Sequence, residues 1–280
     1  MSKTIFVIGA NSALAKELIM RLAPGNTVIA GARKGADVDC DITKPITIPA
    51  GTEVVVNAAA AFGGTTDAEI SEAVQTNVLG LLNICSASKQ AGVRHIVHIS
   101  SLSAVHAPTS PYYSIYALTK RQGDELAAWY CALNHVPLTI LRPSQVYGDD
   151  VGFAKHQPLL YHMADQAARG QDITIYGRHD ALRNYLHSHD LGETIQRVIE
   201  RSITGTYACL YPTNLRLSEI ARAAQQAFDK GGEVTFLDDK PDIPDNVFTL
   251  DMSIYEKIGY YPKVTLAEGM RRIRAHREGA

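Results

Sequence analysis

The sequence predicts an α/β fold with a doubly wound parallel sheet, and three observations support this prediction. Short runs rich in Val, Ile and Leu alternate with longer segments whose apolar residues recur every three or four positions. Such alternation is typical of parallel strands joined by helices that cover both faces of a sheet. The chain has 280 residues, of which 46% are hydrophobic and 20% charged, so it can bury a sizeable core.

Strands and helices are expected to alternate regularly through the first half of the chain. The expected strands are 3–9, 26–32, 53–59, 95–100 and 137–142, and the expected helical stretches are 13–23, 67–91 and 114–134. In an open parallel sheet, ligands bind beyond the carboxyl ends of the strands. We therefore expect a ligand site in the turns that follow these strands.

The pattern changes after residue 148, where the run 148–185 is rich in Gly, His, Asp and Tyr. Further helices are expected near 158–169, 190–201, 217–229 and 265–277, and short strands near 206–210 and 233–237. We expect a sheet domain over 1–147 and a smaller lobe over 148–280. A strand and a helix within 186–212 are expected to return to the sheet domain.

Charge and cysteine content narrow the kinds of partner. The net charge is −2 with no long basic run, which disfavours nucleic acid and anionic membranes. No apolar run reaches the roughly 18 residues of a membrane span, and the N-terminal run is too short for a signal peptide. The four cysteines are far apart, without zinc or disulfide spacing, and are expected to be small buried side chains. We expect a cytoplasmic protein without a metal site.

The first turn, GANSALA (9–15), places small residues where a dinucleotide would need them. Such a turn needs little side chain at the tight bend, beside the pyrophosphate, and where the helix packs on the strand. Gly9, Ser12 and Ala15 fill these three places. The signal is weak alone, because a plain strand–turn–helix is as common. If it is a phosphate site, the backbone from Asn11 through Ser12, Ala13 and Leu14 faces the phosphate at the helix start.

The segment SSLSAVHAPTSPYYSIYALTK (100–120) gives the turn a chemical context. Tyr116 and Lys120 are four residues apart on an expected helix and therefore share a face. A lysine ammonium beside a phenol is expected to lower the tyrosine pKa from about 10, so that the phenol exchanges protons with a carbonyl or alcohol. Ser100 and Ser101 close the preceding strand, where a hydroxyl can hydrogen-bond the same oxygen.

With these motifs the chain resembles the short-chain dehydrogenase/reductase superfamily, and within it the extended branch that modifies nucleotide sugars. The resemblance covers nearly the whole chain. It includes the segments DCDIT (39–43), NAAA (57–60), QTNVLGLLNI (75–84), LRPSQVYG (140–147), RNYLHSHDL (183–191) and IGYYPKVTLAEGMRR (258–272). It implies an NAD(P)-binding Rossmann domain over 1–147 and a substrate-binding lobe over 148–280.

The resemblance assigns roles to individual residues. The family's catalytic trio falls on Ser101, Tyr116 and Lys120, with Ser103 as the alternative serine. Asp41 corresponds to the aspartate that contacts adenine, and Asn77 to a structural and relay position near the lysine. The remaining implied cofactor contacts are Ile42, Ala58, Ala59, Ala60 and Pro143.

The end of the second strand, IAGARKG, bears on which dinucleotide binds. An NAD site has an acid on the ribose there, whereas an NADP site has an arginine for the 2′-phosphate. Ala30 and Gly31 occupy the place of the acid, and Arg33 follows. This favours NADP(H), with NAD(H) as the alternative because Asp37 and Asp39 come shortly afterwards.

The segment ITIYGRHDALRNYLHSHDL (173–191) resembles the substrate signature of the family. By resemblance Arg183 pairs with the nucleotide diphosphate, as guanidinium matches phosphate oxygens well. Gln145 and Tyr185 are further candidates for substrate binding.

The resemblance implies an NAD(P)-dependent enzyme, and two reactions stay open. The family's 4,6-dehydratases have Thr-Asp-Glu where this chain has Ser101-Leu102-Ser103. The acid and base for water elimination are therefore missing from this chain. Reduction of a 4-keto nucleotide sugar comes first and 4-epimerisation with bound NAD second. A non-catalytic dinucleotide sensor is a third hypothesis, although such relatives usually lack the tyrosine or the lysine. A homodimer would be usual for the family.

Overall fold

The computed structural model describes residues 2–279, which form two compact units. The first comprises the residues up to Pro143 together with Gly192–Cys209 and Ser253–Ile258. The second comprises Ser144–Leu191, Leu210–Met252 and the residues from Gly259 onward. The functional division into a cofactor domain and a substrate lobe stays a prediction.

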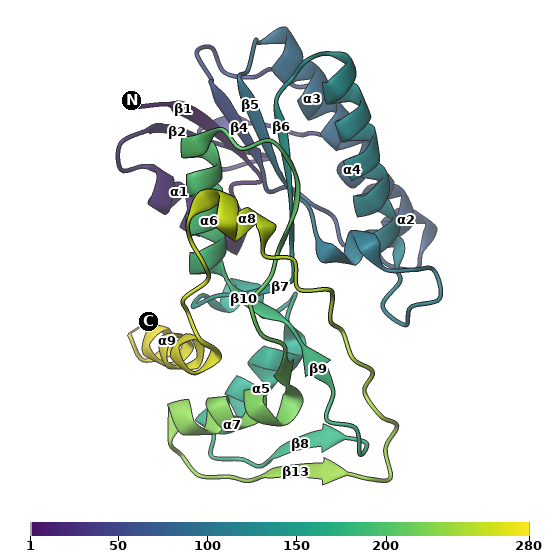
Figure 1. Cartoon of the computed structure of the whole chain (residues 1–280), viewed down its shortest axis with the longest axis vertical. Coiled ribbons are helices and arrows are strands. Elements are labelled where there is room, and N and C mark those ends of the chain that lie inside the picture. The colour runs from purple at the N-terminus through teal and green to yellow at the C-terminus, as the bar shows by residue number, and fades with distance from the viewer. Residues whose placement is uncertain (1, 280) are drawn as a thin grey trace. The chain divides into compact units, whose positions relative to one another are not determined.

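A seven-stranded sheet in the order β3-β2-β1-β4-β5-β6-β11 forms the centre of the first unit (Figure 1). Every neighbouring pair is parallel, which confirms the doubly wound fold. The last strand adds to β6, as expected for the segment near 206–210. The strands are β1 (Thr4–Ile8), β2 (Thr27–Ala32), β3 (Val38–Asp39), β4 (Val54–Asn57), β5 (His95–Ile99), β6 (Leu138–Pro143) and β11 (Gly205–Cys209).

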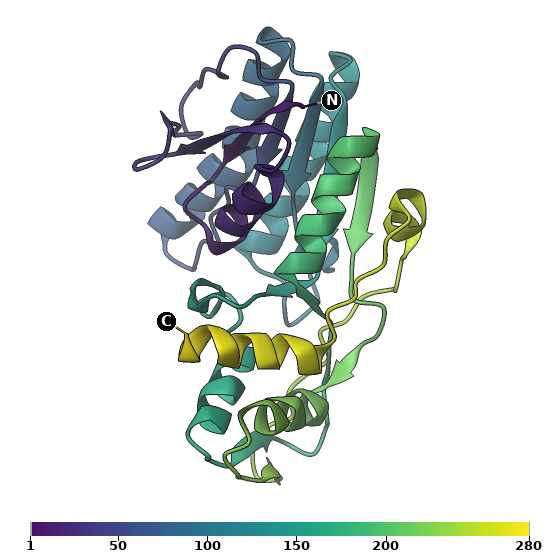
Figure 2. The ribbon, with the colours of Figure 1, turned by 90° about the vertical axis from the view of Figure 1, so that its left-hand side faces the viewer.

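Helices cover both faces of this sheet. Figure 1 shows α2, α3 and α4 on one side, with α1 and α6 on the other, and Figure 2 shows that second face toward the viewer. Arg21 of α1 and Glu193 of α6 form an ion pair of 2.6 Å that joins the two helices on this face. The helices are α1 (Ala13–Leu22), α2 (Asp67–Val74), α3 (Gly80–Gln90), α4 (Ile115–Leu133), α6 (Ser188–Arg201) and α8 (Ser253–Ile258), with the short 3-10 helix η2 (Leu102–Val105) before α4.

The core of the first unit lies between the central strands and the helices α3 and α4. Phe6, Val55 and Ile96 from three neighbouring strands are fully buried together with Ile84 of α3. All four cysteines are free and buried, which confirms that they pack as small side chains. Burial on both faces explains why these strands are apolar throughout rather than alternating.

The long helix expected over 67–91 is interrupted by a π-helical segment, η1 (Gln75–Leu79). The N–H of Gly80 donates to the carbonyl oxygen of Gln75, five residues earlier. Asn77 of η1 is buried at the point where η1 packs against α4. A Cβ on Gly123 of α4 would lie 2.3 Å from the carbonyl oxygen of Asn77, so only glycine fits this contact.

The second unit combines three helices with short strand pairs. Two pairs are parallel, β7 (Gln145–Tyr147) with β10 (Tyr185–His187) and β8 (Ile173–Tyr176) with β13 (Val234–Leu237). The third, β9 (Leu182–Arg183) with β12 (Leu215–Arg216), is antiparallel. Helix α7 (Leu217–Phe228) packs against α5 (Pro158–Ala168) and α9 (Leu266–Glu278), and η3 (Val151–Phe153) is a 3-10 turn. No helix within residues 2–279 is long and apolar enough to span a bilayer.

We predict that Gly123→Ala destabilises the protein although the same change usually stabilises a helix by about 0.5–1 kcal/mol. The added methyl would meet the Asn77 carbonyl at 2.3 Å, so η1 and α4 must separate. Such overpacking costs typically 1–3 kcal/mol in the free energy of unfolding, measured by urea denaturation. Gln122→Ala on the exposed side of α4 is the control, and equal stability of the two variants would contradict the prediction.

Candidate active site

The turn after β1 is held in place by the turn after β4. Gly9 has a φ of +85°, and a Cβ there would lie 2.6 Å from the backbone nitrogen of Ala59. Glycine is therefore required both by the backbone angle and by the close approach of the second chain segment. These two turns lie at the carboxyl ends of β1 and β4, where the order of strands reverses.

The start of α1 offers backbone donors at this point. Ser12 caps the helix, since its hydroxyl accepts from the N–H of Ala15 at 3.2 Å. The N–H groups of Ala13 and Leu14 have no acceptor one turn earlier in the helix, so they can donate to an anion. Ala15 is fully buried against the sheet, as expected for the third small residue. The three small residues therefore form a cradle that fits a dinucleotide pyrophosphate.

The loop after β2 presents basic side chains to solvent. Arg33 and Lys34 are exposed, and the Asn11 amide donates to the Lys34 carbonyl oxygen at 2.9 Å. The Asp37 carboxylate accepts from the N–H of Ala30 in β2 at 2.8 Å, so one of its oxygens is already hydrogen-bonded to the strand. Asp39 ends β3 and is exposed. Arg33 is thus the better candidate in this loop for contact with a ribose or its phosphate.

Asp41 lies on the connection that follows β3. Its carboxylate accepts from the Thr43 hydroxyl at 2.7 Å, and this hydrogen bond is the main cause that lowers the pKa of Asp41. The positive charges of Lys44 and Arg33 lower it further. Ile42 is buried, and its side chain fills the space beside Gly80. Asp41 is therefore ionised and accessible at neutral pH.

The alanines after β4 form the opposite wall of the same edge. Ala58 and Ala59 are half-buried and Ala60 is exposed. Asn77 holds the segment that follows them, since its side chain accepts from the N–H of Ala61 at 2.9 Å and donates to its carbonyl oxygen at 2.7 Å. Asn77 also donates to the Thr119 hydroxyl at 2.9 Å, one residue before the lysine of the trio. Its expected structural role is visible here, and its relay role stays a prediction.

The three residues of the expected catalytic trio come from two elements of the first unit. Ser101 caps η2, and its hydroxyl oxygen accepts from the N–H of Ser103 at 3.0 Å. The same Ser101 side chain is hydrogen-bonded to the phenol of Tyr116. This contact favours Ser101 over Ser103 as the serine of the trio. Lys120 lies one turn after Tyr116 on α4 and is 1% exposed.

The expectation for the tyrosine pKa has the wrong direction. Burial raises the pKa of Tyr116 to about 12, and the hydrogen bond from Ser101 only partly opposes this effect. Lys120 is not among the groups that shift the pKa of Tyr116. Burial lowers the pKa of Lys120 to about 8, and its ammonium donates to the Ile99 carbonyl oxygen at 2.9 Å. The phenol therefore stays protonated at neutral pH.

Phe62 is an aromatic neighbour of Tyr116 that the sequence analysis missed. The two rings are stacked, with centroids 4.5 Å apart and planes inclined by 12°. Phe62 follows the alanine segment directly and keeps 46% of its surface exposed. It covers one face of the phenol and presents an apolar surface beside it.

A buried polar group under Lys120 was also missed. The Asp124 carboxylate accepts from Ser100 at 2.8 Å and from Arg142 at 2.8 Å. Burial raises the pKa of Asp124, while Lys120, Ser100 and Arg142 oppose it. His98 lies against Lys120 at 3.3 Å. Asp124 could have been found from its spacing of four residues after Lys120, whereas nothing local marked His98.

The candidate substrate residues lie in the second unit. Gln145 begins β7 opposite Tyr185 of β10, and Tyr185 is buried edge-on against Tyr147. Arg183 is also buried, and its Nη1 donates to the carbonyl oxygens of Leu182 at 2.8 Å and Pro244 at 2.9 Å. The Gln145 side-chain oxygen is buried and accepts no hydrogen bond from the residues that the structure describes. Their roles in substrate binding stay predictions. The role of Pro143, at the end of β6 in the first unit, in cofactor binding also stays a prediction.

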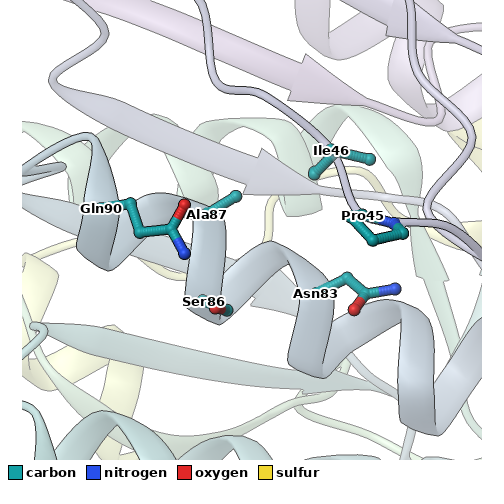
Figure 3. Close-up of a pocket in the computed structure, with 6 residues that line it drawn as sticks. All are labelled: Pro45, Ile46, Asn83, Ser86, Ala87 and Gln90. Atoms are coloured by element: carbon teal, nitrogen blue, oxygen red, sulfur yellow. The ribbon is translucent and has the colours of Figure 1, made fainter.

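A shallow hollow elsewhere on the first unit carries none of this chemistry. Figure 3 shows it between α3 and the segment before β4, lined by Pro45, Ile46, Asn83, Ser86, Ala87 and Gln90. The Asn83 amide donates to the carbonyl oxygens of Ile42 and Lys44, which ties the two segments together. None of the six lining residues has a side chain that titrates near neutral pH.

Two curated proteins are similar to this chain in sequence. CapI of Staphylococcus aureus is 24% identical over 251 residues, which cover 79% of this chain and 74% of CapI. UDP-glucuronic acid decarboxylase 4 of Arabidopsis thaliana is 26% identical over 212 residues, 70% of this chain. That alignment spans 47% of the decarboxylase, about half of its length.

Two solved structures share the fold over almost the whole chain. UDP-glucuronic acid 4-epimerase of Bacillus cereus, solved with NAD, superposes with a TM-score of 0.79 at 18% identity and covers 99% of both chains. RMD of Pseudomonas aeruginosa, solved with NADPH, gives a TM-score of 0.76 at 18% identity over 100% of this chain and 98% of that chain. At this level of identity the similarity shows the fold.

The family model of the NAD dependent epimerase/dehydratase family matches residues 5–208. This range contains the cradle after β1, the alanine segment after β4 and the trio on η2 and α4. The resemblance to extended short-chain dehydrogenases/reductases is confirmed. The chain belongs to the NAD dependent epimerase/dehydratase family of enzymes.

Proposed function

We propose that the protein uses NADPH to reduce a 4-keto nucleotide sugar in the cytoplasm. The observation that carries the proposal is the hydrogen bond between Ser101 and Tyr116, with Lys120 one turn further on the same helix. A phenol held by a serine hydroxyl can give its proton to a carbonyl oxygen that accepts from both groups.

The chemistry needs one hydride and one proton. A nicotinamide, when bound beside the trio, would supply the hydride. Tyr116 gives its proton to the oxygen as negative charge develops there, and the Ser101 hydroxyl stabilises that charge. A phenol pKa of about 12 keeps Tyr116 in the proton-donating form that reduction requires. Phe62 limits how water reaches the phenol from one side.

Binding of the phosphorylated cofactor is assigned to the loop after β2. Arg33 is exposed there and forms no ion pair with a carboxylate among residues 2–279, whereas Asp37 already accepts from Ala30. A guanidinium matches a phosphate better than it matches a ribose hydroxyl. RMD, which shares the fold, was solved with NADPH.

The substrate is assigned to the nucleotide sugars because the relatives are named for UDP-sugar reactions. Arg183 and Gln145 are the residues that would hold the diphosphate. Remote contacts of this kind orient the sugar ring for hydride transfer.

A 4-epimerase is the second candidate function. The same three residues would first take the proton of the sugar hydroxyl while a bound NAD would take the hydride of the same carbon. The hydride would then return to the opposite face of that carbon and the proton to its oxygen, which would regenerate NAD. The B. cereus structure with this fold is a 4-epimerase solved with NAD. Incubation with NADPH and UDP-, dTDP-, GDP- and CDP-sugars separates the two: a reductase consumes NADPH stoichiometrically with product, whereas an epimerase interconverts two hydroxy-sugars without net consumption.

We predict that Tyr116→Phe lowers turnover by about 10²–10⁴-fold while cofactor binding survives. The change removes the proton donor and keeps the ring that stacks on Phe62. Turnover is followed by the absorbance of reduced nicotinamide and binding by calorimetry. Tyr113→Phe, three residues earlier and outside the trio, is the control. Full activity of Tyr116→Phe would show that the catalytic assignment is wrong for either reaction.

We predict that Arg33→Ala weakens NADPH binding about ten- to a hundred-fold and leaves NADH nearly unchanged, since only NADPH carries the 2′-phosphate. Calorimetric titration of both dinucleotides measures the effect. Arg94→Ala is the control, because Arg94 is exposed and pairs with Glu53 at 3.1 Å. Equal losses for both dinucleotides would mean that Arg33 has another role, and a native preference for NADH would refute the assignment.

A further inference from the structure

The lysine of the trio belongs to a buried cluster of polar side chains, and the roles assigned so far do not explain its other members. The buried cluster comprises Asn57 of β4, His98 of β5, and Lys120 and Asp124 of α4, each at most 2% exposed. Buried polar groups are stable only when their donors meet acceptors. The direction of each hydrogen bond in the cluster therefore has consequences for the charge on Lys120.

The backbone fixes the orientation of the Asn57 amide, and Asn57 then fixes the proton on His98. The N–H of Ala59 donates to the Asn57 side-chain oxygen at 3.0 Å, so the amide nitrogen points the other way. That nitrogen lies 3.0 Å from Nδ1 of His98 and can only donate. Nδ1 must accept, so a neutral His98 carries its proton on Nε2. Burial, Lys120 and Arg142 lower the pKa of His98, which keeps the ring neutral.

The Nε2 proton of His98 faces Lys120 at a distance of 3.3 Å between the two nitrogens. An N–H group cannot accept from an ammonium group, so a charged Lys120 finds its acceptor at the Ile99 carbonyl oxygen instead, at 2.9 Å. An uncharged amine has a lone pair and can accept the His98 proton. The ring therefore offers a hydrogen bond to one protonation state of Lys120 only.

The other charged groups around Lys120 affect the balance between its ammonium form and its uncharged amine. Asp124 attracts the ammonium form, but its Oδ2 already accepts from Ser100 and Arg142. Its Oδ1 has no hydrogen-bond partner and lies 3.6 Å from Nε2 of His98. Tyr116 is protonated at neutral pH and adds no charge. Burial has the larger effect on Lys120 and lowers its pKa, whereas Asp124 raises it.

We infer that His98, fixed by Asn57, is a positioning residue that stabilises the uncharged amine of Lys120 by offering it an N–H rather than a lone pair. The inference rests on the proposed function for its catalytic meaning. The Lys120 ammonium, one turn further along α4, is the source that we assign to the proton that Tyr116 must regain after giving its own to the substrate oxygen. One N–H bond of Lys120 breaks, one O–H bond of Tyr116 forms, and the resulting amine accepts from Nε2–H of His98.

The test is a titration of Lys120 in the protein without cofactor or substrate. The ¹³Cε resonance of Lys120, identified by its loss in Lys120→Arg, reports the protonation of the amine by NMR. Burial places the wild-type midpoint near 8. In His98→Gln the side-chain carbonyl can accept from the ammonium, so the midpoint should rise by about one pH unit, the worth of one hydrogen bond.

His95→Gln is the matched control. His95 is also a buried histidine of β5, but its Nε2 lies 2.8 Å from the Thr139 hydroxyl instead of facing Lys120. The Lys120 midpoint should stay unchanged in this variant. An unchanged midpoint in His98→Gln, or an equal rise in both variants, would overturn the inference.

A second measurement needs no variant and decides the question if His98→Gln does not fold. Long-range ¹H–¹⁵N spectra of the wild-type protein show which ring nitrogen of His98 carries the proton. A proton on Nε2 and none on Nδ1 supports the inference. A proton on Nδ1, or a charged ring at neutral pH, refutes it. Because neither measurement uses substrate, a failure to reduce any nucleotide sugar would refute the proposed function alone.

Discussion

The near contact between the backbones of Gly9 and Ala59 is the constraint on which the rest of the first unit depends. There is no space for a side chain between them, since a Cβ on Gly9 would lie 2.6 Å from the Ala59 nitrogen. This contact brings the start of α1 next to the alanine segment. The same segment then leads to Phe62 against the phenol, and Asn57 just before it orients His98. One close approach of two turns thus connects the start of α1 with the helix that carries Tyr116 and Lys120.

The charges beneath the trio show how a fold can hold ionisable groups away from water. Lys120 and Asp124 are each 1% exposed, and an unpaired charge at such a position would be costly. The cost is limited because Asp124 meets Arg142 and Ser100, and because Lys120 meets a carbonyl oxygen. Removing one member leaves the others buried without a partner, so this region tolerates coordinated changes better than single ones.

Local patterns in the sequence predict the strands and part of the site, whereas contacts between distant residues leave no local pattern. The central strands and the shared face of Tyr116 and Lys120 follow from residue periodicity, and the family model confirms the fold-level reading. His98 was missed because its partners Asn57 and Lys120 lie 41 and 22 residues away. The direction of the Tyr116 pKa shift was wrong because burial comes from the tertiary fold. The strands β7, β8, β9 and β10 were missed since runs of two to four residues carry no clear period.

The π-helical turn Gln75–Leu79 has a bearing on how the segment that contains Ala61 is held. A π turn holds about one residue more per turn than the α-helix around it, and the helix continues on both sides of it. Removing one residue here would restore an unbroken α-helix and rotate the preceding turns by about 100° relative to α3. The amide of Asn77 would then leave Ala61 and Thr119. A chain of this fold with an unbroken helix here would therefore need other contacts to hold the segment that contains Ala61.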